Sequence, residues 1–387
     1  MARRFDGAGV PTCFAGFFSS EAVNTLADHI AEICKVYNLG QPLNNIERVP
    51  GGLLHQLYYV RTERGEYAIK CMENNVLKNL QHTLLTPEQT QQITQYMFQR
   101  SIPTVVALKH NHHFTLNLGL NTYLVMPWIK GEVLQSSEIT PSMTRLVGQC
   151  LRKVQIDASL LPDFAPLSCL VSAPDSSAPS SLVSAPDSSP PSSRDLFAGS
   201  RLEKLNSHFP LPHWIGHKKN EWQTLLRPYC GISSPIIEKL NAALVNLTQW
   251  SEQARSVQTN LNHELVLSHR DFDPKNVVWQ ARDHPILLDW EYAGLINPKL
   301  DLFIVALNWS EVTSGNIHTD KFNSVIEGYS NSQQESVSFP FEIIAGYKGY
   351  CLDWLAYNLQ RLNSSPLAEN EIAKTLNAIY AVEEIYN

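Results

Sequence analysis

Two short hydrophobic runs with polar residues at fixed spacing constrain the fold of the carboxyl-terminal half of this chain. The first, ELVLSHRDFDPKNVVW, carries His269, Arg270, Asp271 and Asn276, and the second, PILLDWEY, has Asp289 near its end. The residues RDHP between the two runs predict a hairpin turn. The pattern predicts a small β island in a half that otherwise has helical periodicity.

The spacing of these polar residues fits metal-assisted phosphoryl transfer. A kinase catalytic loop has His-Arg-Asp and then, after four further residues, Asn. Its carboxylate receives or orients the proton of the acceptor hydroxyl, while the amide oxygen reaches a metal ion. Asp271 and Asn276 have this spacing, and Asp289 stands where a second Mg²⁺-binding carboxylate is expected. Alternatively, these side chains only shape a turn and cap a strand.

The amino-terminal third supplies a candidate nucleotide site. LYYVRT and EYAIKC flank a turn and predict a hairpin, whose second strand carries Lys70 as the candidate phosphate contact. Gly51 and Gly52 precede it and would let the backbone approach a phosphate, although paired glycines also mark plain turns. Glu88 is the only carboxylate of the following helix, so it is either the partner of Lys70 or a residue that suits the helix dipole.

Periodicity along the chain predicts an α+β fold with two lobes. A helix is expected at 20–38 and another from Thr86, as N-cap, and Pro87. The hairpin and strand patterns at 103–108 and 121–129 add a small antiparallel sheet that carries one helix. Further helices are expected at 141–158, at 234–255 and from 341. The expected division is a tail at 1–19, a nucleotide-binding lobe at 20–130 and a mainly helical lobe at 131–387.

A tandem repeat interrupts the helical half. Residues 170–193 read LVSAPDSSAPSS and then LVSAPDSSPPSS, with few bulky apolar side chains. Such a segment cannot offset the backbone entropy of ordering, so disorder is expected over about 168–195. A docking or phosphorylated segment is the alternative. Because Lys70 and Asp271 lie on either side of it, the repeat is interpreted as an insertion in one catalytic unit rather than a linker.

These motifs resemble the aminoglycoside phosphotransferase and choline kinase-like family, which shares the protein-kinase fold. GGLLHQLYYVRT is similar to its nucleotide loop, YAIK to its phosphate-lysine strand and YLVMPWIKGEVL to its hinge. HRDFDPKNVVW resembles its catalytic loop, and LLDWEYAGLINPKLDL its metal-binding segment. The resemblance implies the following roles: Asp271 as the catalytic base, Asn276 and Asp289 as Mg²⁺ ligands, Lys70 as an ATP contact, Met126 and Trp128 beside the adenine, and Asp301 as a support behind the catalytic loop with His269 and Arg270.

Departures from related motifs narrow the substrate. Asp273 stands where protein kinases carry Lys, Glu291 replaces the Gly of Asp-Phe-Gly, and no Ala-Pro-Glu follows, so a small-molecule kinase is expected. His55 in the nucleotide loop leaves ATP or GTP open as the phosphoryl donor. Tyr350, Trp354 and Tyr357 have helical spacing. They either pack in the core or line an acceptor pocket, with Asp353 or a carboxyl-terminal Glu holding a cation.

Composition excludes few function classes. The net charge of −7 argues against nucleic acid as a partner and suits a cationic acceptor. Seven scattered cysteines without a Cys-x-x-Cys pair fit a reducing, cytosolic compartment. No membrane span or secretory signal is expected. The histidines of KHNHHF are interpreted as a solvated loop rather than a metal site.

The sequence therefore predicts an ATP- and Mg²⁺-dependent phosphotransferase. The expected acceptor is a hydroxyl group of a small molecule such as an aminoglycoside or an amino-alcohol. The alternative is a nucleotide-binding pseudokinase or scaffold protein, against which the complete set of Lys70, Asp271, Asn276 and Asp289 argues.

Overall fold

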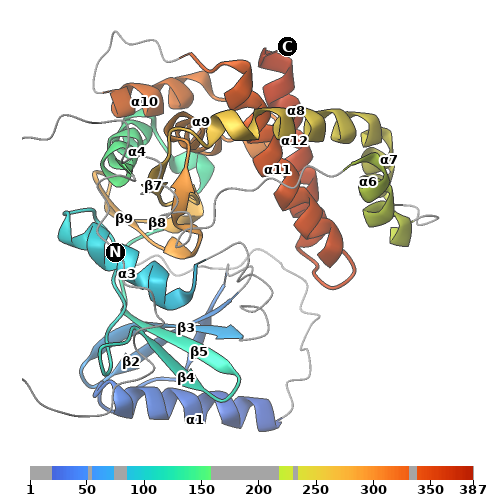
Figure 1. The fold of residues 1–387 in the computed structure, drawn as a ribbon. Coiled ribbons are helices and arrows are strands. Elements are labelled where there is room, and N and C mark those ends of the chain that lie inside the picture. Colours follow the sequence, from blue (N-terminus) through green and yellow to red (C-terminus); the bar gives the residue numbers. More distant parts are fainter. Residues whose placement is uncertain are drawn as a thin grey trace, which may run out of the picture. The chain divides into compact units, whose positions relative to one another are not determined.

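The computed structural model describes residues 20–50, 55–73, 85–157, 218–229, 234–330 and 338–386 (Figure 1). The chain divides into two compact units, residues 1–77 with 107–128 and residues 78–106 with 129–387. Gly51, Gly52 and the repeat at 170–193 lie outside the described residues. The α+β class that the sequence predicts is confirmed, because an antiparallel sheet of five strands is combined with many helices.

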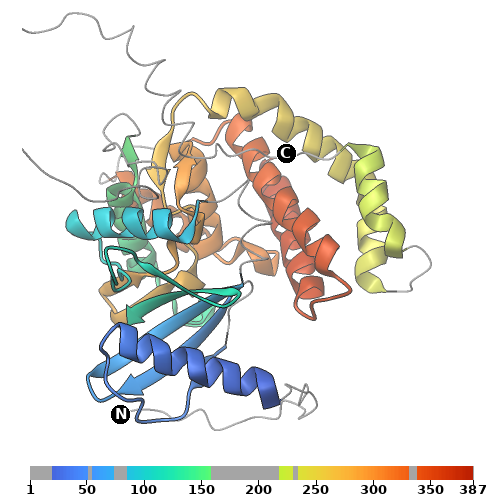
Figure 2. The same ribbon diagram turned by 60° about the horizontal axis from the view of Figure 1, so that its bottom comes forward.

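The first unit is an antiparallel sheet covered by one helix. Its strands, in the order β1-β2-β3-β5-β4, are β1 Glu47–Val49, β2 Gln56–Thr62, β3 Gly65–Glu73, β5 Asn121–Pro127 and β4 Thr115–Leu118. The expected hairpin is the β2–β3 pair, in which Thr62 pairs with Gly65. Helix α1, Ser20–Val36, runs across this sheet in both ribbon views (Figures 1 and 2).

Alternation along the strands separates the two faces of this sheet. Ile69 and Val125 are fully buried and pack with Ile30 and Ile33 of α1. Lys70 pairs with Leu124, and Ala68 pairs with Met126. Since successive side chains of a strand point to opposite faces, Lys70 and Met126 share the face opposite to α1.

The second unit is mainly helical. Its helices are α3 Pro87–Gln99, α4 Pro141–Val154, α6 Lys219–Leu226, α7 Pro235–Ala242, α8 Leu244–Leu261, α9 Pro298–Trp309, α10 Thr319–Ser330, α11 Phe341–Arg361 and α12 Ala368–Tyr386. Helix α9 is apolar on nearly every side, and its buried side chains join two core clusters, one with α11 and α12 and one with α4. Asn297 caps α9 by accepting from the N–H groups of Lys299 and Leu300.

A β island in the second unit carries the polar motif. It contains a three-stranded sheet, β10-β7-β6, and a hairpin of β8 and β9. The bounds are β6 Ile156–Asp157, β7 Val266–Ser268, β8 Val277–Ala281, β9 His284–Leu287 and β10 Gly294–Ile296. Short 3-10 helices, η5 Pro274–Asn276 and η6 Trp290–Tyr292, lie between the strands. The island and the turn between β8 and β9 confirm the β island and the hairpin turn that the sequence predicts.

Three details of the expected secondary structure are wrong. Residues 103–108 form no strand, because their backbone hydrogen bonds go to two different segments. Thr104 bridges to Leu287, and the N–H of Leu108 donates to the carbonyl of Val125. The sheet strand is instead β4, joined to β5 by a tight turn at Gly119, whose φ is +58°. The expected helix at 234–255 is two helices that meet at Ala243, and the helix expected to 158 ends at Val154.

The one helix expected on the small sheet is α1, whereas helix α3 packs in the second unit. Its N-cap is Thr86 with Pro87 at its first position, and the side chain of Gln89 completes a capping box. The apolar side chains Ile93 and Met97, however, belong to a core cluster of the second unit. Capping and periodicity determine where a helix begins, but not which of two apolar surfaces it covers.

Candidate active site

The catalytic-loop segment of the sequence lies between β7 and β8 and faces the end of β9. Arg270 and Asp289 both adopt left-handed backbone conformations, with φ of +63° and +60°. Side chains other than glycine rarely adopt this conformation, which costs about 1–2 kcal/mol per residue. Such residues concentrate at functional sites, where the surrounding structure holds them.

His269 ties the loop to the segment that carries Asp289. Its imidazole is fully buried, and its two nitrogens have different partners. The carbonyl of Leu288 can only accept, so Nε2 carries the proton and donates to it at 2.8 Å. Nδ1 then accepts from the N–H of Asp271 at 3.3 Å. Burial lowers the pKa of His269, and the neutral ring joins Asp271 to the residue before Asp289.

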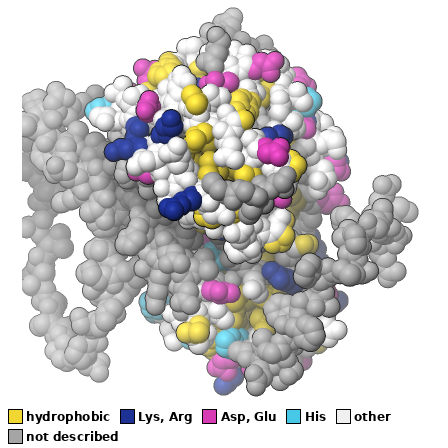
Figure 3. Space-filling model, turned by 90° about the vertical axis from the view of Figure 1, so that its right-hand side faces the viewer, with side chains coloured by type: hydrophobic (Ala, Val, Ile, Leu, Met, Phe, Trp, Pro, Cys, Tyr) yellow, Lys and Arg dark blue, Asp and Glu magenta, His cyan; other side chains and the backbone are white. Residues whose placement is uncertain are grey.

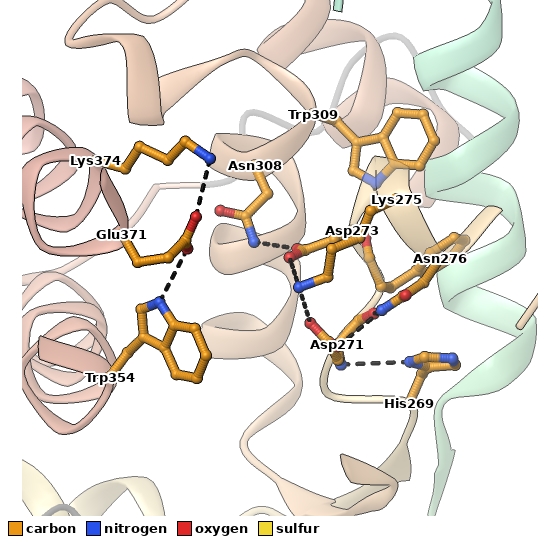
Figure 4. Close-up of polar contacts among 11 residues, drawn as sticks. His269, Asp271, Asp273, Lys275, Asn276, Asn308, Trp309, Trp354, Glu371 and Lys374 are labelled. Atoms are coloured by element: carbon orange, nitrogen blue, oxygen red, sulfur yellow. Dashed lines mark hydrogen bonds and ion pairs between the residues drawn. The ribbon is translucent and has the colours of Figure 1, made fainter. Parts of the chain in front are cut away.

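Asn276 fixes the carboxylate of Asp271. Its amide nitrogen donates to Asp271 Oδ2 at 2.7 Å and to the Asp271 carbonyl at 2.9 Å (Figure 4). Its own backbone accepts from the N–H of Leu288 at 2.8 Å. Because the amide nitrogen is engaged, the amide oxygen is the atom of Asn276 that can ligate a cation.

A second carboxylate and a lysine complete this cluster. Lys275 Nζ lies 3.5 Å from Asp271 Oδ1 and 3.2 Å from Asp273 Oδ2. The other oxygen of Asp273 accepts from the side-chain amide of Asn308 on α9, as Figure 4 shows. The indole of Trp309 donates to the carbonyl of Phe272 at 2.7 Å, so two consecutive residues of α9 hold the loop.

Burial and like charge act together on Asp271. The pKa of Asp271 is raised to about 8. Burial is the largest cause and the negative charge of Asp273 is the next, whereas the positive charge of Lys275 lowers the pKa. A carboxyl group with a raised pKa holds a proton more strongly than an exposed one does. Once ionised, such a group is a stronger base toward the acceptor hydroxyl than an ordinary carboxylate is.

Asp301 and Arg270 lie behind the loop. Asp301 is buried on α9 and accepts from the side-chain nitrogen of Gln155 at 2.8 Å. Burial lowers the pKa of Arg270, and the charge of Asp301 raises it in turn. A Cβ atom on Gly294 would lie 2.8 Å from a terminal nitrogen of Arg270, so a side chain at this position of β10 would displace the guanidinium.

The oxygen atoms of this site fit a divalent ion. The amide oxygen of Asn276 and the carboxylate of Asp289 are hard ligands of the kind that Mg²⁺ takes, and Mg²⁺ commonly uses one or two protein oxygens together with substrate phosphates. Across the described ranges, no three His, Cys, Asp or Glu side chains gather to hold a metal by themselves.

Among the candidate nucleotide residues that the structure describes, Lys70, Met126 and Trp128 lie in the first unit and Glu88 lies in the second. Trp128 donates its backbone N–H to Glu66 at 2.9 Å, and its ring packs edge-on against Tyr59, 4.9 Å between centroids. Met126 and Lys70 share one face of the sheet, as described above. Glu88 is buried in the first turn of α3, which belongs to the second unit, so its pairing with Lys70 stays a prediction.

The aromatic run of α11 lies at the border of the core. Leu352, Leu355 and Leu359 are buried, whereas Tyr350, Trp354 and Tyr357 are each half-buried. The rings of Trp354 and Tyr357 stack at 5.4 Å between centroids. The indole of Trp354 donates to Glu371 of α12 at 3.3 Å, and Lys374 contacts the same carboxylate at 2.9 Å (Figure 4).

Sequence reasoning did not assign a role to Lys275 or Asn308, although signals for both were present. Lys275 lies four residues after Asp271 inside the motif, and Asn308 follows Asp301 by seven residues in one helix. Two helical turns place Asp301 and Asn308 near one face of α9, which the motif Asn297-Pro298 begins.

Comparisons with known proteins identify the family. A model of the phosphotransferase enzyme family matches residues 45–330. A search of curated protein sequences found no match. In the part of the chain that the structure describes, no helix is long and apolar enough to cross a bilayer.

Several solved structures share the fold at low sequence identity. A spectinomycin phosphotransferase in complex with ADP and spectinomycin has a TM-score of 0.58 and 13% identity, over 93% of this chain and 94% of that one. The choline kinase of Streptococcus pneumoniae has a TM-score of 0.55 and 14% identity, over 93% and 99%. The ethanolamine kinase of Plasmodium vivax has a TM-score of 0.54 and 13% identity, over 95% and 89%.

These similarities confirm the kinase-like fold, and the matched segment contains both the Lys70 strand and the catalytic-loop motif. The family match covers most of the chain, which confirms the expected enzyme class. The chain belongs to the phosphotransferase enzyme family.

Proposed function

We propose that the chain transfers the γ-phosphoryl group of ATP to a hydroxyl group of a small molecule and requires Mg²⁺. The arrangement of Asp271 and Asn276 carries this proposal. The amide nitrogen of Asn276 holds Asp271 Oδ2 at 2.7 Å, which directs Oδ1 to the acceptor hydroxyl and the amide oxygen of Asn276 to an ion. The similarity in fold to an enzyme solved with ADP supports a nucleotide as the donor.

Each remaining residue would have a separate role in binding. Lys70 would contact the phosphates of the nucleotide, and Met126 and Trp128 would contact the adenine, since Lys70 and Met126 share one face of the sheet. Glu88 would orient Lys70. GTP is the alternative donor.

Magnesium bound by Asn276 and Asp289 would neutralise charge on the phosphates. His269 would keep Asp271 in register with the segment of Asp289 through its two hydrogen bonds. Arg270 and Asp301 would support the loop from behind, and Gly51 and Gly52 would bring backbone N–H groups to the phosphates.

A cationic amino group on the acceptor would suit the α11–α12 residues. The Tyr357 ring stacks on Trp354 and already has the guanidinium of Arg361 over it at 4.9 Å, so the ring of Trp354 is the one that would receive the acceptor's cation. Glu371 lies at 3.3 Å from the Trp354 indole and would share its charge between Lys374 and the acceptor. The relatives of similar fold include kinases for choline, ethanolamine and spectinomycin, which supports this choice of acceptor class.

The surface supports a small molecule over nucleic acid as the partner. On the face in Figure 3, acidic and basic side chains are interspersed among hydrophobic and uncharged ones. The net charge of −7 would repel a polyanion. The unpaired cysteines Cys34, Cys71, Cys150 and Cys351 are buried and fit the cytosolic location that the sequence suggests.

A screen of acceptors tests the proposal. Transfer of label from [γ-³²P]ATP would be measured with Mg²⁺ and, separately, choline, ethanolamine, spectinomycin and uncharged sugars. We expect phosphorylated product with at least one amine-bearing acceptor and none when Mg²⁺ is chelated. Nucleotide binding without transfer to any acceptor would instead favour the scaffold alternative.

A further inference from the structure

Lys275 occupies a position in the catalytic loop that the proposed roles leave unexplained. Its ammonium lies 3.5 Å from Asp271 Oδ1 and 3.2 Å from Asp273 Oδ2. The lysine side chain is 54% exposed, whereas those of Asp271 and Asp273 are 16% and 20% exposed. The cation therefore lies on the solvent side of the two carboxylates.

The two carboxylates have other partners that hold them. Asn276 donates to Asp271 Oδ2, and Asn308 donates to Asp273 Oδ1. Both amides are anchored in regular structure, one in η5 and one in α9. Lys275 is not needed to orient either carboxylate, and it contacts the oxygen of each that the amides leave.

The acceptor hydroxyl would meet the same oxygen. If Asp271 receives the proton as proposed, Oδ1 accepts from the hydroxyl, whose oxygen then lies about 2.7 Å away. The ammonium of Lys275 already contacts Oδ1 at 3.5 Å. The attacking oxygen and the ammonium thus have a common neighbour, and the phosphorus atom becomes bonded to that attacking oxygen.

We propose that Lys275 is a catalytic residue whose ammonium contacts the phosphoryl group while that group passes from the nucleotide to the acceptor hydroxyl. This inference rests on the proposed function. The bond from the hydroxyl oxygen to the γ-phosphorus forms, and the bond from that phosphorus to the bridging oxygen breaks. The bridging oxygen leaves with its electron pair on the nucleoside diphosphate, and the hydroxyl proton passes to Asp271 Oδ1. Lys275 stays protonated and donates hydrogen bonds only.

The surroundings of Lys275 allow its ammonium to move from the two carboxylates toward the phosphoryl group. Its flexible four-carbon stem lets the ammonium move away from the carboxylates toward a bound phosphoryl group. Asp273, held by Asn308, keeps the ammonium at the site before and after transfer. A positive charge held beside the attacking oxygen would stabilise the negative charge on the phosphoryl group during transfer.

A purely structural role for Lys275 makes a different prediction. If the lysine only neutralises the two carboxylates, its loss changes stability and the pH dependence of turnover through Asp271, but it leaves kcat as it was at a pH where Asp271 is ionised. If it contacts the phosphoryl group, its loss lowers kcat with little change in the affinity for MgADP, which lacks that group.

The test compares Lys275→Met and Lys275→Arg with the wild type. Lys35→Met is the matched control, because Lys35 also makes an ion pair at 3.5 Å, with Glu32 on α1. Thermal unfolding verifies that each variant is folded. With the best acceptor of the screen, we expect Lys275→Met to lower kcat by about 10²-fold, as loss of one charge-stabilising donor does. Lys275→Arg should recover part of the loss, and Lys35→Met should match the wild type.

Binding of MgADP with and without aluminium fluoride, a mimic of the transferring group, separates the inference from the proposed function. Aluminium fluoride should tighten the binding of MgADP to the wild type and to Lys35→Met, but it should tighten binding to Lys275→Met much less. The inference alone would be overturned if Lys275→Met had the kcat of the wild type and if aluminium fluoride tightened its binding of MgADP as much as in the wild type. A wild type with neither transfer nor tightening would overturn the proposed function and the inference together.

Discussion

Replacing His269 with Phe should separate the buried hydrogen bonds of the catalytic loop from its packing. Phenylalanine keeps a ring of similar size against Trp290, whose centroid lies 4.6 Å away, but it removes both nitrogen atoms. The carbonyl of Leu288 and the N–H of Asp271 then lose their partners. An orphaned group costs about 1–3 kcal/mol, and the bond of 3.3 Å is the weaker one, so we expect a loss of about 2–4 kcal/mol at pH 7.

The size of this loss should depend on pH. Burial lowers the pKa of His269 in the fold, whereas in the unfolded chain it is about 6.5. The unfolded state therefore binds a proton that the folded state does not, and the stability that His269 provides is present above pH 6.5 and falls as the pH falls. At pH 5.5 this protonation stabilises the unfolded wild type by about 1.4 kcal/mol, against about 0.2 kcal/mol at pH 7.

Urea unfolding of the two proteins at pH 7.0 and pH 5.5 measures both effects. The difference in unfolding free energy between wild type and His269→Phe should shrink at the lower pH, by up to about 1.2 kcal/mol for a ring that stays neutral in the fold. His284→Phe is the control, because His284 lies exposed on β9 beside Asp283 and its replacement should cost little. A difference that stays constant or grows as the pH falls would refute a neutral, buried His269.

Three further predictions concern the loop charge, the core and the repeat. Because the charge of Asp273 helps to raise the pKa of Asp271, Asp273→Asn should move the acidic limb of the kcat/KM profile to lower pH. An unmoved or higher limb would contradict the coupling. Gly148→Ala should destabilise the protein by about 1–3 kcal/mol in thermal unfolding, because the new Cβ would lie 2.0 Å from the backbone carbonyl oxygen of Val325 on α10. An unchanged unfolding midpoint would show that the two helices separate freely. Deleting residues 170–193 should leave the fold intact, as measured by circular dichroism, and ATP binding intact, as measured by calorimetry. Loss of the folded state would show that the composition of the repeat was misinterpreted.

Local sequence signals were sufficient where neighbouring residues determine the structure. The β2–β3 hairpin, the Thr86 cap and the β8–β9 hairpin all depend on contacts between segments that are adjacent along the chain. The catalytic-loop motif belongs to the same class, because Asn276 reaches Asp271 within a single turn.

Contacts between distant segments could not be predicted in the same way. The sequence predicts one helix on the small sheet, but no local pattern showed that this helix is α1 and that Ile93 and Met97 of α3 pack in the second unit. Asn308 holds Asp273 from a helix that begins 22 residues after Asn276, so no local pattern links the two side chains. The strand expected at 103–108 failed for the same reason, since Thr104 and Leu108 bond to different segments.

Turnover of an Asp271→Ala variant tests the central claim most directly. The matched control is Asp283→Ala, which removes a carboxylate that is 72% exposed at the turn between β8 and β9. With [γ-³²P]ATP, Mg²⁺ and an active acceptor, Asp271→Ala should lower kcat by about 10²–10⁴-fold while MgADP still binds, and Asp283→Ala should match the wild type. Full activity in Asp271→Ala would contradict the assignment of Asp271 as the base.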